Sequence, residues 1–417
     1  MHNRPRLVVA RWRCPGLARR LGARLLKLLK LLKLLSLLIL ARPLAAQTTL
    51  RLAAVPPATP AGAVLFVAGS FNGWQPAAPA YALARQPDGT YQLTLPATVR
   101  GPHEFKLTRG SWATGEADAQ GRPLANRRAD FGPGAVVISL TVAAWQDQAA
   151  AAGPPTARRS TRTANVRVLS DSFRLPELGG RARRVWLYLP PGYATSRRRY
   201  PVLYLQDGQN VFDEATAYAG EWGVDETLNR FADSTRDGGD GGCLVVAVDH
   251  GGERRLDEYS PWRNEELKKG GEGSQYADFL AHTLKPYVDA HYRTRPDAAH
   301  TGVAGSSMGG LISLYAGLKY PDVFGRVGVF SPAIWFAKDS VLSYLRRQPA
   351  PRASRFYFVA GPAESETMLP LMAAARDGLR ARGVPATQLR LRAPADGQHA
   401  EWFWRREFGA AYRWLFR

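Results

Sequence analysis

The distribution of apolar and polar residues divides the chain into two regions that both contain β-strands. Between residues 48 and 145, short β-rich runs alternate with Gly, Pro and Asp: "AVLFVAGSFNGW", "GTYQLTLPA", "HEFKLTRGSW" and "AVVISLTV". Several short strands at such spacing are typical of a small all-β sandwich. We therefore predict an immunoglobulin-like sandwich over residues 47–145.

From residue 166 onward the pattern changes. Apolar runs of strand length, among them "YPVLYLQDGQN", "CLVVAVDH", "HTGVAGSS" and "RFYFVAGPAE", alternate with stretches of helical period such as 274–290 and 308–319. Strands that alternate with helices imply a mostly parallel sheet with helices on both faces. The predicted class of residues 166–417 is therefore α/β, with a mostly parallel sheet. Residues 146–165, which hold almost no large apolar side chain, are predicted to be a linker.

Residues 1–46 have the composition of an export signal. An Arg-rich stretch precedes "LLKLLKLLKLLSLLILARPLAAQ", whose apolar part at 34–40 is too short to span a bilayer. We predict a signal peptide here and an exported protein, periplasmic or secreted, with no stable membrane span after cleavage. The alternative is an amphipathic helix at a membrane surface, because Lys27, Lys30 and Lys33 recur at helical spacing.

The formal net charge of +21 at first suggests a nucleic-acid partner. The first 46 residues carry 11 Lys or Arg and no Asp or Glu, which leaves 45 basic and 35 acidic residues scattered over the rest. No nucleic-acid partner is expected. Of the two cysteines, Cys14 lies in the predicted signal and Cys243 is expected in a buried strand, so no intrachain disulfide is expected.

A strand-to-helix junction in the second region carries a candidate nucleophile. The apolar run "TGVAG" leads into "GSSMGG", residues 305–310, and then into a helical stretch. In a G-x-S-x-G motif the serine occupies a strained turn that exposes its hydroxyl, and small residues two positions away prevent clashes. Only Ser307 has glycine at both of those positions, which favours it over Ser306. The alternative is a Ser/Gly-rich turn that merely caps the helix.

A serine hydroxyl needs a base, and that base needs a carboxylate to orient it. His399 follows the last predicted strand, and the other six histidines all precede Ser307. Glu364, in "PAESE" after the strand "RFYFVAG", is the favoured carboxylate, with Glu366 and Asp396 as competitors. The chain order Ser, Glu, His is the order of α/β-hydrolase triads.

The negative charge that develops on the substrate oxygen requires two aimed N–H groups. One is expected from Met308, the residue after the nucleophile. The other is expected from Gln209, in the turn after "YPVLYLQDGQN", where Gly208 lets the chain bend. An ordinary Asp-Gly turn is the alternative for Gln209.

These motifs together resemble a known family. From about residue 181 to 417 the chain is similar to α/β-hydrolase esterases of the family that includes feruloyl and acetyl-xylan esterases, the esterase D group and enterochelin-esterase-like proteins. The matching stretches are "VWLYLPPGY", "YPVLYLQDGQNVFD", "GSSMGG", "YPDVFGRVGVFSP", "VAGPAESE" and "GQHAEWFWRREF". The resemblance implies a triad of Ser307, Glu364 and His399. "LQDG" replaces the "HG" turn that many members carry, which leaves the geometry of the Gln209 amide open.

The first region resembles starch- and glycogen-binding modules through "AGSFNGW" and "HEFKLTRGSW". The resemblance implies that Trp74, Lys106 and Trp112 contact a glucan, since aromatic faces stack on sugar rings and lysine donates to hydroxyls. The alternative is an accessory domain whose tryptophans pack inside it or against the neighbouring domain.

A loop after the strand "CLVVAVDH", residues 249–262, holds further charged and aromatic side chains. Its position after a strand places it on the same sheet edge as the predicted triad. Trp262 is the predicted substrate contact from this loop. Ion pairs that stabilise the loop are the alternative for its charged residues.

No cluster of histidines or cysteines has zinc-ligand spacing, and neither a phosphate-binding loop nor a G-x-G-x-x-G follows the first strand. No metal and no cofactor are expected. The sequence predicts a secreted serine esterase that acts through an acyl-enzyme, with a feruloyl or acetyl ester on a polysaccharide as the favoured substrate. A siderophore trilactone is the alternative substrate, acyl transfer to an alcohol stays open, and a non-catalytic glucan-binding protein is the alternative of another class.

Overall fold

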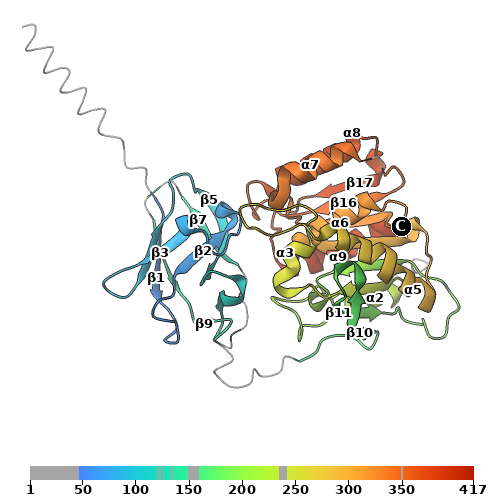
Figure 1. The fold of residues 1–417 in the computed structure, drawn as a ribbon, viewed down its shortest axis with the longest axis horizontal. Coiled ribbons are helices and arrows are strands. Elements are labelled where there is room, and N and C mark those ends of the chain that lie inside the picture. The colour runs from blue at the N-terminus through green and yellow to red at the C-terminus, as the bar shows by residue number, and fades with distance from the viewer. Residues whose placement is uncertain are drawn as a thin grey trace, which may run out of the picture.

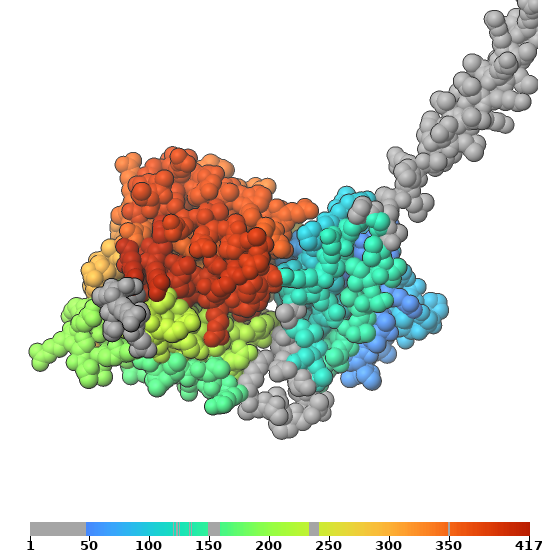
Figure 2. Space-filling view, turned by 180° about the vertical axis from the view of Figure 1, so that it is seen from behind, coloured from blue at the N-terminus to red at the C-terminus, as the bar shows by residue number. Residues whose placement is uncertain are grey.

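The structure is a computed structural model that describes residues 47–119, 121, 124, 126–132, 134, 136–148, 159–233, 242–348 and 351–417. The predicted signal and half of the predicted linker lie outside this set. Figure 1 shows an N-terminal group of strands beside a larger region in which strands alternate with helices. We call them the N-terminal region (47–148) and the C-terminal region (159–417), and their surfaces also meet in Figure 2.

The N-terminal region consists of short strands joined by turns. They are β1 (Thr49–Ala54), β2 (Leu65–Gly69), β3 (Ala82–Arg85), β4 (Tyr91–Thr94), β5 (Gly101–Thr108), β6 (Glu116–Ala117), β7 (Arg127–Phe131), β8 (Val137–Thr141) and β9 (Ala144–Trp145). Seven of them pair in the order β7-β5-β2-β3-β4-β1-β8, and β6 pairs with β9. Their core contains Leu50, Val67, Phe105, Phe131 and Trp145. The likeness to an immunoglobulin sandwich stays a prediction.

One eight-stranded sheet organises the C-terminal region. Its strands are β10 (Val166–Leu175), β11 (Arg181–Tyr188), β12 (Val202–Gln206), β13 (Leu244–Val248), β14 (Thr301–Ser306), β15 (Arg326–Phe330), β16 (Arg355–Val359) and β17 (Leu389–Arg392). They pair in the order β10-β11-β13-β12-β14-β15-β16-β17. The pairs that involve β10 and β11 are antiparallel and all others are parallel. The predicted mostly parallel sheet is confirmed.

The helices between these strands cover both faces of the sheet. They are α2 (Val224–Asp233), α3 (Arg255–Glu258), α4 (Gly273–Asp278), a π-helical stretch (Phe279–Leu284), α5 (Lys285–His291), α6 (Met308–Lys319), α7 (Lys338–Arg347), α8 (Met368–Ala381) and α9 (Glu401–Phe416). The helical patterns predicted at 274–290 and 308–319 correspond to the run from α4 to α5 and to α6.

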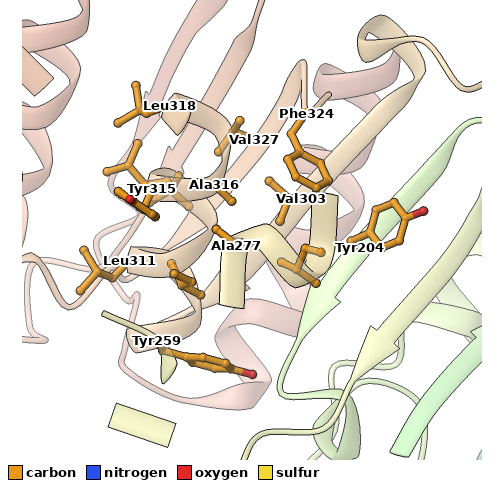
Figure 3. Packing of buried hydrophobic residues seen from close by; sticks show 14 of the residues in the cluster. Tyr204, Tyr259, Ala277, Val303, Leu311, Tyr315, Ala316, Leu318, Phe324 and Val327 are labelled. Atoms are coloured by element: carbon orange, nitrogen blue, oxygen red, sulfur yellow. The ribbon is translucent and has the colours of Figure 1, made fainter. Parts of the chain in front are cut away.

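Alternate side chains of each strand enter two separate cores, because successive residues of a strand point to opposite faces. On β12, Tyr204 packs with α4 to α8, whereas Leu203 and Leu205 pack with α2 and α9. Figure 3 shows the first core, where residues of α6 lie on one side of Val303 and Tyr204 lies on the other, near Phe324. Cys243 is buried, as expected, but it lies directly before β13 rather than in the strand.

Parallel strands bring their carboxyl ends to one edge, which is where α/β folds bind ligands. In this sheet β12, β14, β15 and β16 are consecutive neighbours, so their carboxyl ends lie side by side. Three non-glycine residues directly after these ends have positive φ: Asp207 (55°), Ser307 (56°) and Ser331 (42°). No helix in the described part of the chain is long and apolar enough to cross a membrane.

Candidate active site

Ser307 occupies a strained turn between β14 and α6. Its backbone angles are φ 56° and ψ −122°, a conformation that costs a non-glycine residue on the order of 1–3 kcal/mol. Its N–H donates to the carbonyl of Phe330 (3.0 Å), and its carbonyl accepts from the N–H of Ala333 (3.0 Å). The neighbouring end of β15 therefore holds the turn in place. Ser307 is half-buried, whereas Ser306 is buried as the last residue of β14.

Close backbone approaches explain the two glycines that flank this turn. A Cβ added to Gly305 would lie 2.8 Å from the backbone of Gly309 and 2.9 Å from Gln206 Cγ. A Cβ added to Gly309 would lie 3.0 Å from Oδ2 of Asp207. Side chains at either position would push the turn away from β12. The small residues of the G-x-S-x-G motif thus have a steric cause in this structure.

His399 and Glu364 form a hydrogen-bonded pair at the same edge of the sheet. Nδ1 of His399 lies 2.9 Å from Oε2 of Glu364, whose side chain is 1% exposed. Because a carboxylate only accepts hydrogen bonds, Nδ1 must carry the proton, and Nε2 is left as the nitrogen able to take one. The loops that carry the two residues touch: a Cβ on Gly361 would lie 1.8 Å from the carbonyl oxygen of Gly397.

The pKa of His399 is raised above its usual value. Burial acts to lower this pKa, but the hydrogen bond and the negative charge of Glu364 more than offset burial. Two further carboxylates, Glu104 and Glu401, act in the same direction. The imidazole is therefore a stronger base than an ordinary histidine.

The two competing carboxylates differ from Glu364 in their contacts. Asp396 forms an exposed ion pair with Arg406. Among the described residues, no hydrogen bond joins Glu366 to His399. Of the three candidates, Glu364 is the one with a carboxylate that contacts the imidazole.

In the described part of the chain, the backbone N–H groups of Met308 and Gln209 donate to no backbone carbonyl outside their own helical turns. Met308 is 2% exposed and is the first residue of α6, where N–H groups lack intrahelical partners. Gln209 lies in a short 3-10 turn, Gly208–Asn210, after β12. Free N–H groups at these positions are what a developing oxyanion needs.

An ion pair supports the turn that carries Gln209. Asp207 has φ 55°, and its carboxylate accepts two hydrogen bonds from Arg255, at 2.7 and 2.8 Å. The N–H of Asp207 donates to the hydroxyl of the buried Tyr259 at 3.2 Å. Sequence reasoning missed Asp207 and Arg255. The aspartate of "LQDG" is the feature of the sequence that could have pointed to this ion pair.

Two further residues of the loop 249–262, Glu258 and Trp262, have structural contacts. Buried Glu258 pairs with Arg181 and Arg183. Trp262 packs against Tyr315 and Tyr344, with ring centroids 5.5 and 5.6 Å apart. These contacts favour the alternative of loop stabilisation, and a substrate contact for Trp262 stays a prediction.

The three predicted glucan-binding residues of the N-terminal region lie near the C-terminal region. Trp74 and Trp112 are half-buried neighbours with ring centroids 6.3 Å apart. Lys106 is 6% exposed, donates to the carbonyl of Leu124, and lies 5.7 Å from the ring centroid of Tyr218 in the C-terminal region. Burial lowers its pKa.

Two more contacts cross between the regions. The amide of Gln146 donates to the hydroxyl of Tyr218 at 3.1 Å. A Cβ on Gly73 would lie 3.8 Å from the ring of Trp335, which lies four residues after Ser331. The predicted glucan-binding residues thus stand close to the loops that follow the sheet edge.

Two side chains that sequence reasoning missed contact the acid–base pair. Ser331 donates to Oε1 of Glu364 at 2.8 Å, and the indole N–H of Trp404 donates to the Ser331 hydroxyl at 2.9 Å. Both residues fall in stretches that carry the family resemblance, "YPDVFGRVGVFSP" and "GQHAEWFWRREF". Among the described residues, no three His, Cys, Asp or Glu side chains gather as a metal site.

Comparison with known sequences places this site in a family. The sequence model of the Esterase family, described as "Putative esterase", matches residues 177–415. The chain belongs to this family. Its members and relatives include named esterases, so the protein is a carboxylic ester hydrolase.

Several relatives match parts of this esterase. The uncharacterized protein YbbA of Bacillus subtilis is 26% identical over 246 residues, 56% of this chain and 92% of that protein. An endo-1,4-beta-xylanase/feruloyl esterase of Xylanibacter ruminicola is 25% identical over 169 residues, 39% of this chain and 21% of the enzyme. A siderophore enterobactin esterase of Emericella nidulans is 28% identical over 164 residues, 35% of this chain and 50% of that protein.

One more sequence and one solved structure are each similar to part of this esterase. An alpha-amylase of Niallia circulans is 44% identical over 110 residues, 26% of this chain and 8% of the amylase. The solved structure of the BES protein from Bacillus cereus has a TM-score of 0.50 and 18% identity, and it covers 64% of this chain and 100% of that one. The structural likeness supports the α/β fold.

Proposed function

We propose that this protein is a serine esterase in which Ser307, His399 and Glu364 form the catalytic triad. The observation that carries the proposal is the hydrogen bond of 2.9 Å between the buried Glu364 and His399. The Glu364–His399 pair lies at the same edge of the sheet as the strained turn that carries Ser307. A buried carboxylate that fixes the tautomer of a histidine is the arrangement that serine hydrolysis requires.

The proposed reaction begins with attack of Ser307 Oγ on the ester carbonyl carbon. Nε2 of His399 takes the hydroxyl proton and then gives it to the leaving alcohol, while Glu364 stabilises the protonated imidazole. The N–H groups of Met308 and Gln209 stabilise the oxyanion. Water then attacks the acyl-enzyme with His399 as the base, and Ser307 is released with the carboxylic acid.

For the substrate, we favour a feruloyl or acetyl ester carried by a polysaccharide. The resemblance to a xylanase/feruloyl esterase supports this acyl class. The stretch shared with an alpha-amylase, together with Trp74 and Trp112 near the site loops, supports a sugar polymer as the carrier. A siderophore ester is the second candidate, because one relative is a siderophore enterobactin esterase.

For localisation, we propose export to the periplasm or the medium. The proposal is supported by the leucine-rich composition and basic start of residues 1–46. Cell fractionation with an antibody against the C-terminal region tests it, and protein found in the cytoplasm at full length would contradict it.

The test is hydrolysis of a substrate panel: p-nitrophenyl acyl esters, methyl ferulate, acetylated xylan, feruloylated arabinoxylan and a catecholate trilactone. Wild type, Ser307→Ala and Ser306→Ala are compared. We expect Ser307→Ala to lose all measurable turnover. Its Tm should stay unchanged, because the substitution removes a single hydroxyl from a half-buried side chain. Ser306→Ala is the matched control and retains activity.

Each outcome of the panel has a separate meaning. Turnover retained by Ser307→Ala would remove Ser307 as the nucleophile. Activity confined to the trilactone would replace the polysaccharide ester by the siderophore substrate. Binding of insoluble starch or xylan without any turnover would favour the non-catalytic alternative, and loss of that binding in a Trp74→Ala, Trp112→Ala variant would locate it.

A further inference from the structure

We propose that Ser331 and Trp404 are positioning residues that hold the carboxylate of Glu364, and through it the imidazole of His399, in place for proton transfer. The inference rests on the proposed triad. Neither side chain needs to touch substrate. Each acts through a hydrogen bond to the next residue, so that four side chains form one chain of donors and acceptors from Trp404 to His399.

The carboxylate of Glu364 is held at both oxygens. Oε2 accepts from His399, while Oε1 accepts from the Ser331 hydroxyl at 2.8 Å and from the N–H of Gly361 at 2.7 Å. A buried carboxylate with such partners has one orientation, because rotation would break at least one charge-assisted hydrogen bond. Ser331 supplies the partner that comes from a different strand.

Ser331 is buried at 0% exposure and stands in the left-handed region, with φ 42°. Its N–H donates to the carbonyl of Val359 at 2.8 Å, which continues the pairing of β15 with β16. A non-glycine residue at positive φ in a buried turn is strained. In this conformation the hydroxyl reaches Glu364, which lies on the loop after β16.

Trp404 fixes the direction of the Ser331 hydroxyl. A hydroxyl can donate once and accept twice. Because the indole N–H of Trp404 donates to the hydroxyl oxygen at 2.9 Å, the hydroxyl proton is free to point at Oε1 of Glu364. The ring of Trp404 also meets the imidazole of His399 edge-on, with centroids 5.2 Å apart and an interplanar angle of 85°.

The same short segment also supports the nucleophile. The carbonyl of Phe330 accepts from the N–H of Ser307, and the next residue, Ser331, contacts Glu364. The end of β15 therefore connects the nucleophile turn to the acid–base pair. A change in Ser331 is transmitted to both halves of the triad.

The test compares Ser331→Ala and Trp404→Phe with wild type in kcat, KM and the pH profile of kcat/KM for p-nitrophenyl acetate. We expect kcat to fall about tenfold in Ser331→Ala, since a hydrogen bond to a charged group is lost, with KM little changed. Trp404→Phe keeps the ring and loses the N–H, so we expect a fall of about threefold.

The pH profile separates positioning from mere folding support. Without the hydrogen bond from Ser331, the negative charge of Glu364 is less stabilised by other donors. It then interacts more strongly with the protonated imidazole of His399 and raises the pKa of His399. The acid limb of kcat/KM should then move to higher pH, by about half a unit. The downfield proton resonance of His399 Nδ1–H in the NMR spectrum should shift in the same variants.

Matched controls remove similar groups elsewhere. Ser313→Ala deletes a buried hydroxyl that has no hydrogen-bond partner in the described structure, and Trp145→Phe deletes a buried indole N–H that donates to Thr59 in the N-terminal region. Both controls should keep the wild-type pH profile and the wild-type His399 resonance.

The outcomes are distinct. Folded Ser331→Ala and Trp404→Phe variants with unchanged kcat and pH profile would overturn the proposal, as would lost activity with an unshifted acid limb and resonance. If Ser331→Ala does not fold, Ser331→Gly, which relieves the positive φ, and Trp404→Phe take its place. Turnover retained by Ser307→Ala would instead remove the proposed triad itself.

Discussion

The N-terminal and C-terminal regions hold their candidate residues in different ways. In the C-terminal region, Glu364 and His399 contact each other, and buried donors occupy the second oxygen of the carboxylate. In the N-terminal region, Lys106 is committed to a backbone carbonyl, and Trp74 and Trp112 contact each other. The first arrangement is the one that proton transfer between side chains requires, whereas the side chains of the second are already engaged in contacts within the protein. Substitutions in the first set should therefore affect every ester, and those in the second should affect large substrates alone.

After the loss of the nucleophile itself, the largest expected effect is that of Glu364→Gln. The carboxylate that stabilises protonated His399 is lost, so we expect kcat to fall about 10³–10⁴-fold. Because Glu364 raises the pKa of His399, its removal lowers that pKa, and the acid limb of kcat/KM should move to lower pH. Steady-state kinetics between pH 5 and pH 9, roughly the range around a histidine pKa, measure both effects.

The matched control for this variant is Glu366→Gln, which removes the neighbouring carboxylate. It should keep the wild-type rate and profile. Equal losses of kcat in the two variants would contradict the assignment of Glu364, because a carboxylate that contacts His399 would then matter no more than one that is only close in sequence.

A smaller effect is expected for Arg255→Lys. Lysine keeps the charge but cannot form the two parallel hydrogen bonds to Asp207, so the turn before Gln209 should lose its fixed geometry. We expect kcat to fall about tenfold, in line with partial loss of an oxyanion donor, and Tm to fall because a partly buried ion pair is weakened. Stopped-flow acylation and thermal unfolding measure the two effects.

Arg254→Lys, one residue earlier and more exposed, is the control for Arg255→Lys. If both variants keep wild-type acylation rates, the ion pair with Asp207 does not support the oxyanion site.

For the N-terminal region, Lys106→Met should separate large from small substrates. We expect kcat/KM for p-nitrophenyl acetate to stay within about twofold of wild type. KM for feruloylated arabinoxylan should rise about fivefold, as for loss of one hydrogen bond, because without the contacts of Lys106 to Leu124 and Tyr218 the N-terminal region no longer presents a fixed surface to a polymer. Arg85→Met removes an exposed cation from the same region as the control. An equal change on both substrates would show that Lys106 acts on folding or on the triad rather than on a polymer.

The smallest effect concerns stability. Burial, with the nearby charge of Asp225, raises the pKa of Glu226 to about 7. Folded protein then binds more protons than unfolded protein between the unfolded pKa of about 4.3 and pH 7, so the free energy of unfolding falls as pH rises through this window. Glu226→Gln should remove this part of the pH dependence and raise Tm near pH 7 by about 2 °C, since the side chain is partly exposed.

Thermal unfolding at pH 4.5 and pH 7.5, roughly on either side of this window, measures that change. The exposed Glu265→Gln is the control and should leave the pH dependence as in wild type. An identical pH dependence in Glu226→Gln and wild type would contradict the raised pKa.

Much of the C-terminal fold was predictable because its signals are local. The apolar runs predicted the parallel strands, and the helical pattern at 308–319 matches α6 residue for residue. The turn at Ser307 was predictable too, because only small residues fit beside a strained strand-to-helix turn. The antiparallel start of the sheet, β10 and β11, was not, since an apolar run does not reveal the direction of its partner.

The candidate site was predictable in part. Chain order pointed to His399, but three carboxylates competed for its Nδ1. The choice depends on which loop reaches the imidazole, and no property of a single residue encodes that distance. Ser331 and Trp404 were missed for the same reason: their contact spans 73 positions of the chain.

The sequence by itself determined the features that depend on neighbours along the chain: the alternation of strands and helices, the glycines around Ser307 and the order of the candidate triad. Backbone sterics and side-chain periodicity act over a few residues, so their effects can be recognised in the sequence alone. The tertiary structure chose Glu364 among the three carboxylates as the one that contacts His399. It alone showed that Ser331 donates to Glu364, that Trp404 donates to Ser331, and that Lys106 meets Tyr218. These contacts join residues far apart in the chain, and their positions are set by the packing of the whole sheet and its helices.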